Sequence, residues 1–204
     1  SPALLPYCAD AAMRAVKLGE LAIVDLERFD LKGSRLAGLR QAVNKGLREG
    51  LEFDVIEQAD VMGSIEDLRR VSDTWLAAHE TREKTFSLGA FQDAYVAPQP
   101  VAVLRTQGKI VAFATLSLTE TKQEATVDLM RFAPDAPRGS MDFLFVRCMK
   151  YLQAAGYRTF NLGMAPLSGM AQREAAPVWD RIGSVIFEHG ERFYNFKGLK
   201  ACLV

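Results

Sequence analysis

The spacing of hydrophobic residues along this chain predicts three amphipathic helices in its first 160 residues. Apolar residues at steps of three and four predict a helix from Gly33 that ends at Gly50. A second helix is expected to begin at a capping Ser64, and a third at a capping Ser140. The predicted buried stripes are Leu36, Leu39, Val43 and Leu47 in the first helix, Ile65, Leu68, Val71, Trp75 and Leu76 in the second, and Met141, Leu144, Phe145, Cys148 and Leu152 in the third.

Shorter apolar or alternating runs between these helices predict strands. Thr106 to Lys109 is expected to form the turn of a hairpin between two of the strands. Pro2 and Pro6 are expected to limit helix formation near the start, whereas residues 177–189 are expected to be helical. The predicted strands are residues 22–26, 51–56, 101–105, 110–118, 125–132, 158–162, 193–196 and 199–204.

This order of elements predicts an α+β fold, in which a central mixed, mostly antiparallel sheet is flanked by helices. The order is similar to that of the GNAT-like acyltransferase fold, in which the strands before and after the middle helix splay apart to admit an acyl donor. A likeness of fold alone does not define the reaction.

The formal net charge is zero, with 25 Lys and Arg against 25 Asp and Glu, which argues against a uniformly basic protein that coats nucleic acid. The charge is nevertheless uneven, because no acid interrupts the cations between residues 32 and 48. We interpret this stretch as a surface for tRNA or lipid phosphate, the alternative being a solvated helix face. Its cations are Lys32, Arg35, Arg40, Lys45 and Arg48.

Metal and membrane-spanning functions find little support in the composition. The three cysteines form no CxxC pair and there are only two histidines, so we expect no metal site and no cofactor. No apolar run approaches the length of about 20 residues that spans a bilayer. The chain is expected to be a soluble piece of a longer protein.

The turn before the third helix bears on a coenzyme A function. Such sites use successive glycine N–H groups at a helix N-terminus to hold a pyrophosphate. Here residues 135–140 keep one glycine, Gly139, and Pro137 removes a backbone donor. A coenzyme A site is therefore disfavoured.

Two sequence runs are more distinctive: NLGMAPLSG at residues 161–169 and RFYNFKGL at residues 192–199. With them, the chain from about Gly19 to Gly198 resembles the C-terminal catalytic domain of the MprF-type phosphatidylglycerol lysyltransferases, or aminoacyl-phosphatidylglycerol synthases. The resemblance implies a GNAT-like aminoacyltransferase domain over residues 31–204, after a linker or the end of a preceding lobe over residues 1–30. In the family the C-terminal run continues into a further basic, aromatic stretch, so we expect this domain to be truncated after Lys200.

The resemblance also implies an activity. Members transfer an aminoacyl group, such as lysyl or alanyl, from aminoacyl-tRNA to a hydroxyl of phosphatidylglycerol at the cytoplasmic face of the bacterial inner membrane. The product changes the charge of the membrane surface and lowers susceptibility to cationic antimicrobial peptides. The implied partners are aminoacyl-tRNA, phosphatidylglycerol and, through the rest of the protein, the membrane surface.

Three residues are the candidates for catalysis: Asp128, Arg131 and Asn161. Asp128 interrupts an apolar strand, where a charge is costly unless it is paired, so it either binds the substrate ammonium, accepts a proton or forms a structural ion pair. Strict alternation places Asp128 on the same face as Met130, and Arg131 on the opposite face unless a bulge intervenes. Arg131 is expected to contact phosphate or Asp128, and Asn161 either donates to an oxyanion or fixes the following turn.

Further polar residues are candidates for binding. Ser168 is more typical of a turn than of a nucleophile, since no histidine is placed to act as its base. Lys197 is a plausible phosphate contact or a solvated strand residue, and Lys84 lies in a charged loop. The full set expected to bind substrate is Asp142, Ser168, Asn195 and Lys197, and the set expected to bind tRNA or lipid phosphate is Arg35, Arg40, Lys45, Arg48 and Lys84.

Two other functions remain open from the sequence. One is a coenzyme A-dependent N-acetyltransferase, and the other is a non-catalytic lobe that binds tRNA or membrane. The identity of the transferred amino acid does not follow from these residues.

Overall fold

The computed structural model describes residues 5–13, 19–34, 36–79, 83 and 90–166. The chain divides into two units, one made of Ser1–Ala22 with Met164–Val204 and the other of Ile23–Gly163. In the first unit, Leu5–Asp10 form helix α1. The expectation that Pro6 limits helix formation there is wrong, because Pro6 occupies the first turn, where the missing N–H has no helical partner.

Six strands form one sheet in the order β1-β6-β5-β4-β3-β2. Neighbouring strands from β2 to β5 pair antiparallel, whereas β5 and β6 pair parallel. The predicted mixed, mostly antiparallel sheet is thereby confirmed. The strands are β1 (Gly19–Asp25), β2 (Glu52–Ile56), β3 (Val101–Thr106), β4 (Lys109–Leu118), β5 (Glu124–Phe132) and β6 (Thr159–Pro166).

The β3–β4 hairpin follows from its turn residues. Thr106 pairs with Lys109, and the two residues between them have positive φ angles, 49° at Gln107 and 77° at Gly108. Two consecutive left-handed residues give a turn whose twist matches that of antiparallel strands. The predicted hairpin is confirmed.

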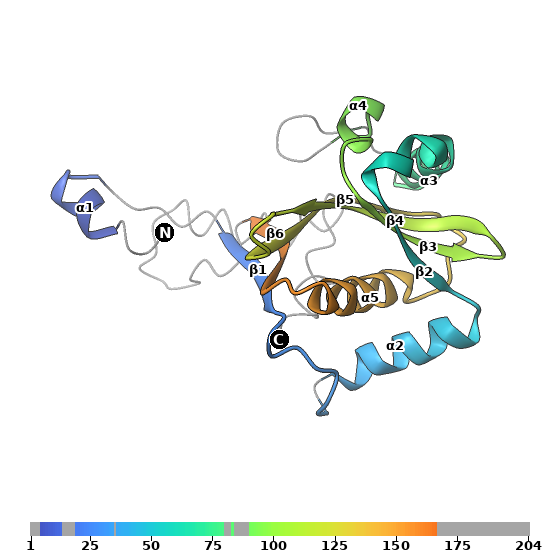
Figure 1. Ribbon diagram of the computed structural model, residues 1–204, viewed down its shortest axis with the longest axis horizontal. Coiled ribbons are helices and arrows are strands. Elements are labelled where there is room, and N and C mark those ends of the chain that lie inside the picture. Colours follow the sequence, from blue (N-terminus) through green and yellow to red (C-terminus); the bar gives the residue numbers. More distant parts are fainter. Residues whose placement is uncertain (1–4, 14–18, 35, 80–82, 84–89, 167–204) are drawn as a thin grey trace. The chain divides into compact units, whose positions relative to one another are not determined.

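Helices cover both faces of the sheet (Figure 1). One face carries α3 (Ile65–Ala78), the 3-10 helix η2 (Gln58–Ser64) that precedes it, and the short α4 (Asp93–Val96). The other face carries α5 (Ser140–Ala154), with α2 (Ala37–Arg48) packed against α5. The core beneath α3 is formed by Ile56, Val61, Ile65, Leu68, Val71, Val96, Val101, Val103, Ile110, Phe113 and Leu129, with Phe91 packed against it.

Gly46 sets the close approach of α2 to α5. It is the buried residue of α2, and a Cβ atom at this position would lie 2.5 Å from Cδ2 of Phe143. The predicted stripe of α2 is wrong at its last position, because the side chain of Leu47 is 56% exposed. The helix turns Gly46 toward α5 and leaves Leu47 outside.

The predicted caps of α3 and α5 are only partly correct. Ser64 is the N-cap residue of α3, but its side chain makes no capping hydrogen bond. At α5 the N-cap residue is Gly139, with φ 88°, rather than Ser140. Ser140 is the first helical residue, and its hydroxyl donates to the carbonyl oxygen of Pro137 at 2.6 Å. A left-handed residue is needed at this turn, which favours glycine.

The remaining predicted elements, the helix over 177–189 and the strands over 193–196 and 199–204, lie outside the described residues. Among the helices in the described part of the chain, none is long and apolar enough to cross a membrane.

Candidate functional site

A β-bulge in β5 shapes the candidate site. Ala114 pairs with Met130 and Leu116 pairs with Val127, so Asp128 and Leu129 together lie opposite Thr115. The hydroxyl of Thr115 accepts a hydrogen bond from the backbone N–H of Leu129 at 3.1 Å. This side-chain acceptor satisfies a backbone group at the point where the regular ladder is interrupted.

The bulge brings the charged residues of β5 to one face of the sheet. Leu129 packs in the core beneath α3, and Arg131 pairs with Phe113, which belongs to the same core. The side chain of Asp128 meets Tyr95 of α4, which lies on this face as well. The bulge required to bring Arg131 to the side of Asp128 is therefore present, whereas the prediction that Asp128 shares a face with Met130 is wrong, because an inserted residue reverses the alternation that a regular strand would impose.

Asp128 is half-buried and accepts a hydrogen bond from the phenol of Tyr95. This hydrogen bond raises the pKa of Tyr95, and partial desolvation and the nearby Asp128 charge act in the same direction. The phenol therefore stays protonated as the donor, facing a carboxylate acceptor. Sequence reasoning missed Tyr95, which lies 33 residues from Asp128 in a helix of only four residues.

Arg131 is fixed by three contacts on the same face. Its Nη2 donates to Oε2 of Glu83 at 3.2 Å, and its Nη1 donates to the carbonyl oxygen of Met130 at 2.8 Å. Its guanidinium carbon lies 4.3 Å from the centroid of the Trp75 ring, and that ring in turn stacks with His79. With only 12% of the side chain exposed, Arg131 is held in one orientation.

Asn161 reaches this face through the parallel pairing of β5 and β6. Asn161 of β6 pairs with Thr126 of β5, and Thr126 pairs with Ser117 of β4. Paired residues share a face of the sheet, and Ser117 lies on the same face as Phe113 because the two are four residues apart in β4. The side-chain oxygen of Asn161 accepts the N–H of Gly163 at 2.9 Å. Of its two predicted roles, this contact supports the one in which Asn161 fixes the following turn.

The parallel ladder of β5 and β6 is short. It joins residues 124–126 to residues 159–161, and within the described residues it extends no further. Asp128 lies two residues beyond the last pair. The candidate site is therefore where these two strands cease to pair, as expected of a fold whose middle strands splay apart.

Other predicted site residues are placed apart from Asp128 or cannot be placed. Asp142 lies in the first turn of α5, on the other face of the sheet. Its role in substrate binding stays a prediction. Five predicted residues lie outside the described part of the chain: Arg35, Lys84, Ser168, Asn195 and Lys197.

The cations of residues 32–48 are better compensated than the sequence suggested. Lys32 lies 3.7 Å from a carboxylate oxygen of Asp30, and Lys45 lies 3.7 Å from one of Glu49. Arg40 donates to the backbone carbonyl oxygens of Leu31 and Gly33 and so closes the loop before α2. Two of the five cations therefore have an acid beside them, contrary to the interpretation of the whole stretch as uncompensated, while the role of the stretch in binding phosphate stays a prediction.

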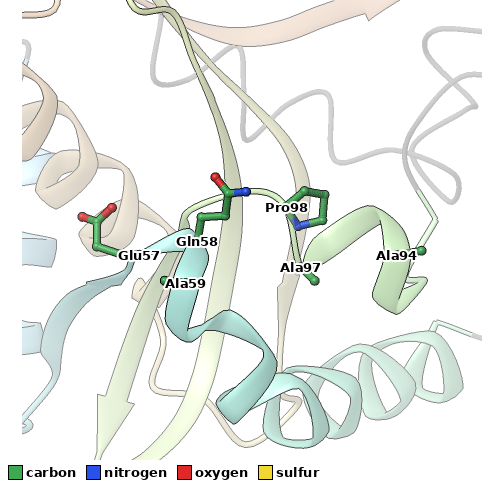
Figure 2. Close-up of a pocket in the computed structure, with 6 residues that line it drawn as sticks. All are labelled: Glu57, Gln58, Ala59, Ala94, Ala97 and Pro98. Carbon is green, nitrogen blue, oxygen red and sulfur yellow. The ribbon is translucent and has the colours of Figure 1, made fainter.

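A shallow hollow of about 650 Å³ lies beside α4, and Figure 2 shows the residues that line it. One wall comes from the start of η2 and the other from α4 and the residues after it. Its described lining holds no cation to bind a phosphate and consists of Glu57, Gln58, Ala59, Ala94, Ala97 and Pro98. A second hollow, of about 420 Å³, is lined by Asp25, Glu27, Gln123, Glu124, Arg158 and Thr159.

Neither hollow has Asp128 among its described lining residues, so the contacts of Asp128 rather than a cavity define the candidate site. Among the described residues there is also no group of three or more His, Cys, Asp or Glu side chains that could hold a metal ion.

Comparisons with known proteins point to one family. The family model described as "Phosphatidylglycerol lysyltransferase, C-terminal" matches residues 1–202. A phosphatidylglycerol lysyltransferase of Bacillus subtilis is 40% identical over 186 residues, which are 91% of this chain and 22% of that protein. One from Staphylococcus haemolyticus is 32% identical over 201 residues, or 98% of this chain and 24% of that protein. The chain thus spans less than a quarter of the length of these relatives.

Solved structures agree with these sequence matches. The C-terminal domain of a putative lysylphosphatidylglycerol synthetase from Agrobacterium fabrum is 63% identical, with a TM-score of 0.83 over 98% of this chain and 60% of that one. L-PGS from Bacillus licheniformis is 36% identical, with a TM-score of 0.75 over 94% of this chain and 61% of that one. FemX, at 7% identity and a TM-score of 0.61, shares the fold alone and supports the GNAT-like architecture. This chain belongs to the family of C-terminal domains of phosphatidylglycerol lysyltransferases.

Proposed function

We propose that this domain transfers an aminoacyl group from aminoacyl-tRNA to a hydroxyl of phosphatidylglycerol. The hydroxyl oxygen attacks the carbonyl carbon of the aminoacyl ester, and a tetrahedral intermediate forms and collapses. The new ester bond joins the aminoacyl group to the lipid, while the bond to the ribose oxygen of the tRNA breaks. The proton of the lipid hydroxyl passes to that ribose oxygen, so one ester replaces another and no oxidant or nucleotide is consumed.

The contact between Asp128 and Tyr95 carries the proposal within the site. A carboxylate that accepts a phenolic hydrogen bond suits a cationic ligand, and the α-ammonium of an aminoacyl ester is such a ligand. We assign Asp128 the role of orienting that ammonium. We assign Arg131, on the same face, to the phosphate of either substrate, which would replace Glu83 as the partner of its guanidinium.

The relatives support the acceptor. They are named phosphatidylglycerol lysyltransferases, and the match to this chain covers at least 90% of its length in the first eight of them. We propose tRNA as the donor and the cytoplasmic face of a bacterial membrane as the place of reaction. A product lipid with added positive charge would reduce the attraction of cationic peptides to the membrane surface.

The test is transfer of labelled lysine or alanine from aminoacyl-tRNA to vesicles that contain phosphatidylglycerol, using the full-length protein. Label is expected in the lipid, and Asp128→Asn is expected to lower the rate well over tenfold, since a lost hydrogen bond to a charged group costs about 1.5–3 kcal/mol. Glu120→Gln, an exposed acid in the turn after β4, is the matched control and is expected to keep full activity.

Parallel assays of the same protein, with acetyl-CoA and an amine or with tRNA and vesicles alone, distinguish the rival functions. Consumption of acetyl-CoA with an amine, without label in lipid, would establish an N-acetyltransferase instead. Binding of tRNA or vesicles without any transfer would establish a non-catalytic lobe. Normal transfer by Asp128→Asn would make Asp128 a structural residue.

We assign to the cations of α2 the role of attracting tRNA or anionic lipid headgroups to the domain. Lys45 is half-buried and Arg48 is exposed in the last turn of the helix. Because such contacts release counterions or are screened, the triple variant Arg40→Gln, Lys45→Gln and Arg48→Gln is expected to weaken binding at low salt and to differ less from the parent at high salt. Unchanged binding at low salt would remove α2 from the interface.

A further inference from the structure

The position of Tyr95 is set by contacts of α4 with the rest of the domain. Helix α4 has four residues, too few to be stable alone, so its place depends on tertiary anchors. Arg69 of α3 forms an ion pair with Asp93, the first residue of α4. Val96, in the last position, is completely buried in the core beneath α3.

The segment before α4 adds to this anchoring. The guanidinium carbon of Arg69 lies 5.5 Å from the centroid of the Phe91 ring. The Phe91 ring meets Phe113 of β4 edge-on, with centroids 5.9 Å apart. After the helix, Nε2 of Gln99 donates to the carbonyl oxygen of Tyr95 at 2.7 Å. An ion pair, aromatic packing and a side-chain hydrogen bond to the backbone therefore hold α4 on both sides of Tyr95.

Tyr95 connects this anchored helix to the bulge of β5. The residue is 40% exposed, while its hydroxyl donates to Oδ2 of Asp128. The bulge leaves Asp128 without the regular strand geometry that would otherwise fix its direction. A phenol held from a separate element supplies a fixed point for the carboxylate.

We propose that Tyr95 is a positioning residue that holds the carboxylate of Asp128 in the orientation that receives the substrate ammonium, and that the Arg69–Asp93 pair anchors Tyr95 for this task. The inference rests on the proposed function. Tyr95 acts through Asp128 and takes no part in bond making or breaking.

The chain offers a matched control. The hydroxyl of Tyr151, on α5, donates to Oε1 of Glu57 at 3.3 Å, so it is a second phenol–carboxylate hydrogen bond. Its helix lies on the other face of the sheet. Tyr95→Phe and Tyr151→Phe each remove one hydroxyl and keep the ring, so they differ in which carboxylate loses its donor.

In the full-length protein, Tyr95→Phe is expected to lower kcat for transfer from aminoacyl-tRNA by about ten- to hundredfold. The KM for aminoacyl-tRNA is expected to change less than threefold or so, because a misdirected Asp128 affects the reacting ester more than the many contacts of the tRNA body. Tyr151→Phe is expected to retain parental kinetics. Equal activity of the two variants would overturn the proposal.

A double-mutant cycle separates positioning from a general loss of folded protein. If Tyr95 acts through Asp128, Tyr95→Phe has little further effect in an Asp128→Asn background. If it only stabilises the fold, the two losses multiply, and the proposal fails. Asp93→Asn is expected to lower kcat as well, and its effect is expected to disappear in the Tyr95→Phe background.

These outcomes also distinguish this inference from the proposed function. Loss of transfer in Asp128→Asn together with normal transfer in Tyr95→Phe would overturn the role of Tyr95 and leave the role of Asp128 intact. Normal transfer in Asp128→Asn would overturn both.

Discussion

The contact of Gly46 with Phe143 allows a stability prediction to be worked out from the structure. A Cβ atom at Gly46 would lie 2.5 Å from Cδ2 of the Phe143 ring, whereas carbon atoms in contact are normally about 3.5–4.0 Å apart. The ring must therefore retreat by about 1 Å or more, although Phe143 is only 1% exposed and lies in a packed interior. Overpacking of this kind costs about 1–3 kcal/mol.

Gly38 provides the control on the same helix. A Cβ atom there has no neighbour within 4 Å. Alanine is better than glycine in a helix by up to about 1 kcal/mol at both sites, so this gain roughly cancels when the two variants are compared. Gly38→Ala is expected to stabilise the domain slightly, and Gly46→Ala to be less stable than Gly38→Ala by about 1–3 kcal/mol.

The assay is urea-induced unfolding followed by circular dichroism, with equal slopes required for the comparison. The melting temperature should differ in the same direction, by about 2–4 °C per kcal/mol for a domain of this size. Phe143→Leu should remove part of the penalty of Gly46→Ala when the two are combined. If Gly46→Ala and Gly38→Ala are equally stable, the close packing of α2 on α5 is refuted.

Four further predictions concern the candidate site and the end of α2. Trp75→Leu is expected to lower the rate of aminoacyl transfer about tenfold, because it releases the guanidinium of Arg131. Trp75→Phe keeps an aromatic ring beneath that group and should retain most of the rate. Equal loss in both variants would contradict the role of stacking. The hydrogen bond to Asp128 raises the pKa of Tyr95, so Asp128→Asn should move the alkaline absorbance titration of this phenol to lower pH. The titration of Tyr95 is isolated by subtracting the curve of the same protein that also carries Tyr95→Phe. Because its pKa is raised, Tyr95 contributes stability that is present below about pH 10 and is lost as the pH rises through the folded-state value. The fall in unfolding free energy between pH 8 and pH 11, measured with urea, is expected to be larger in the parent than in Tyr95→Phe. Arg48→Glu at the exposed end of α2 should weaken binding to phosphatidylglycerol vesicles at low salt, and an unchanged affinity would exclude that end of the helix from the interface.

The sequence by itself determined the secondary structure of the sheet and its large helices. Apolar periodicity is a local property, so the strands over 101–118 and the helix that contains Leu68 and Val71 could be predicted with small errors at their ends. The hairpin turn was equally local, because Gly108 adopts a left-handed conformation that few other residues tolerate. Motif resemblance then indicated the family, which the comparisons confirmed.

The composition of the candidate site was decided by tertiary structure. Asp128 stood out in the sequence because a charge within an apolar strand is costly, but its side of the sheet depended on a bulge opposite Thr115 that no alternation rule contains. Tyr95 could not be found because α4 is too short to show a period, and its link to Asp128 exists only after the chain folds.

Two of the ion pairs near α2 are, by contrast, local. Asp30 lies two residues before Lys32 and Glu49 lies four residues after Lys45, so these acids were missed only because the stretch from residue 32 to residue 48 was counted without its neighbours. Local spacing therefore fixed which segments are helices and strands. Which charges, phenols and carboxylates meet depended on the three-dimensional path of the chain, since electrostatic and hydrogen-bond partners are chosen by distance in space rather than along the sequence.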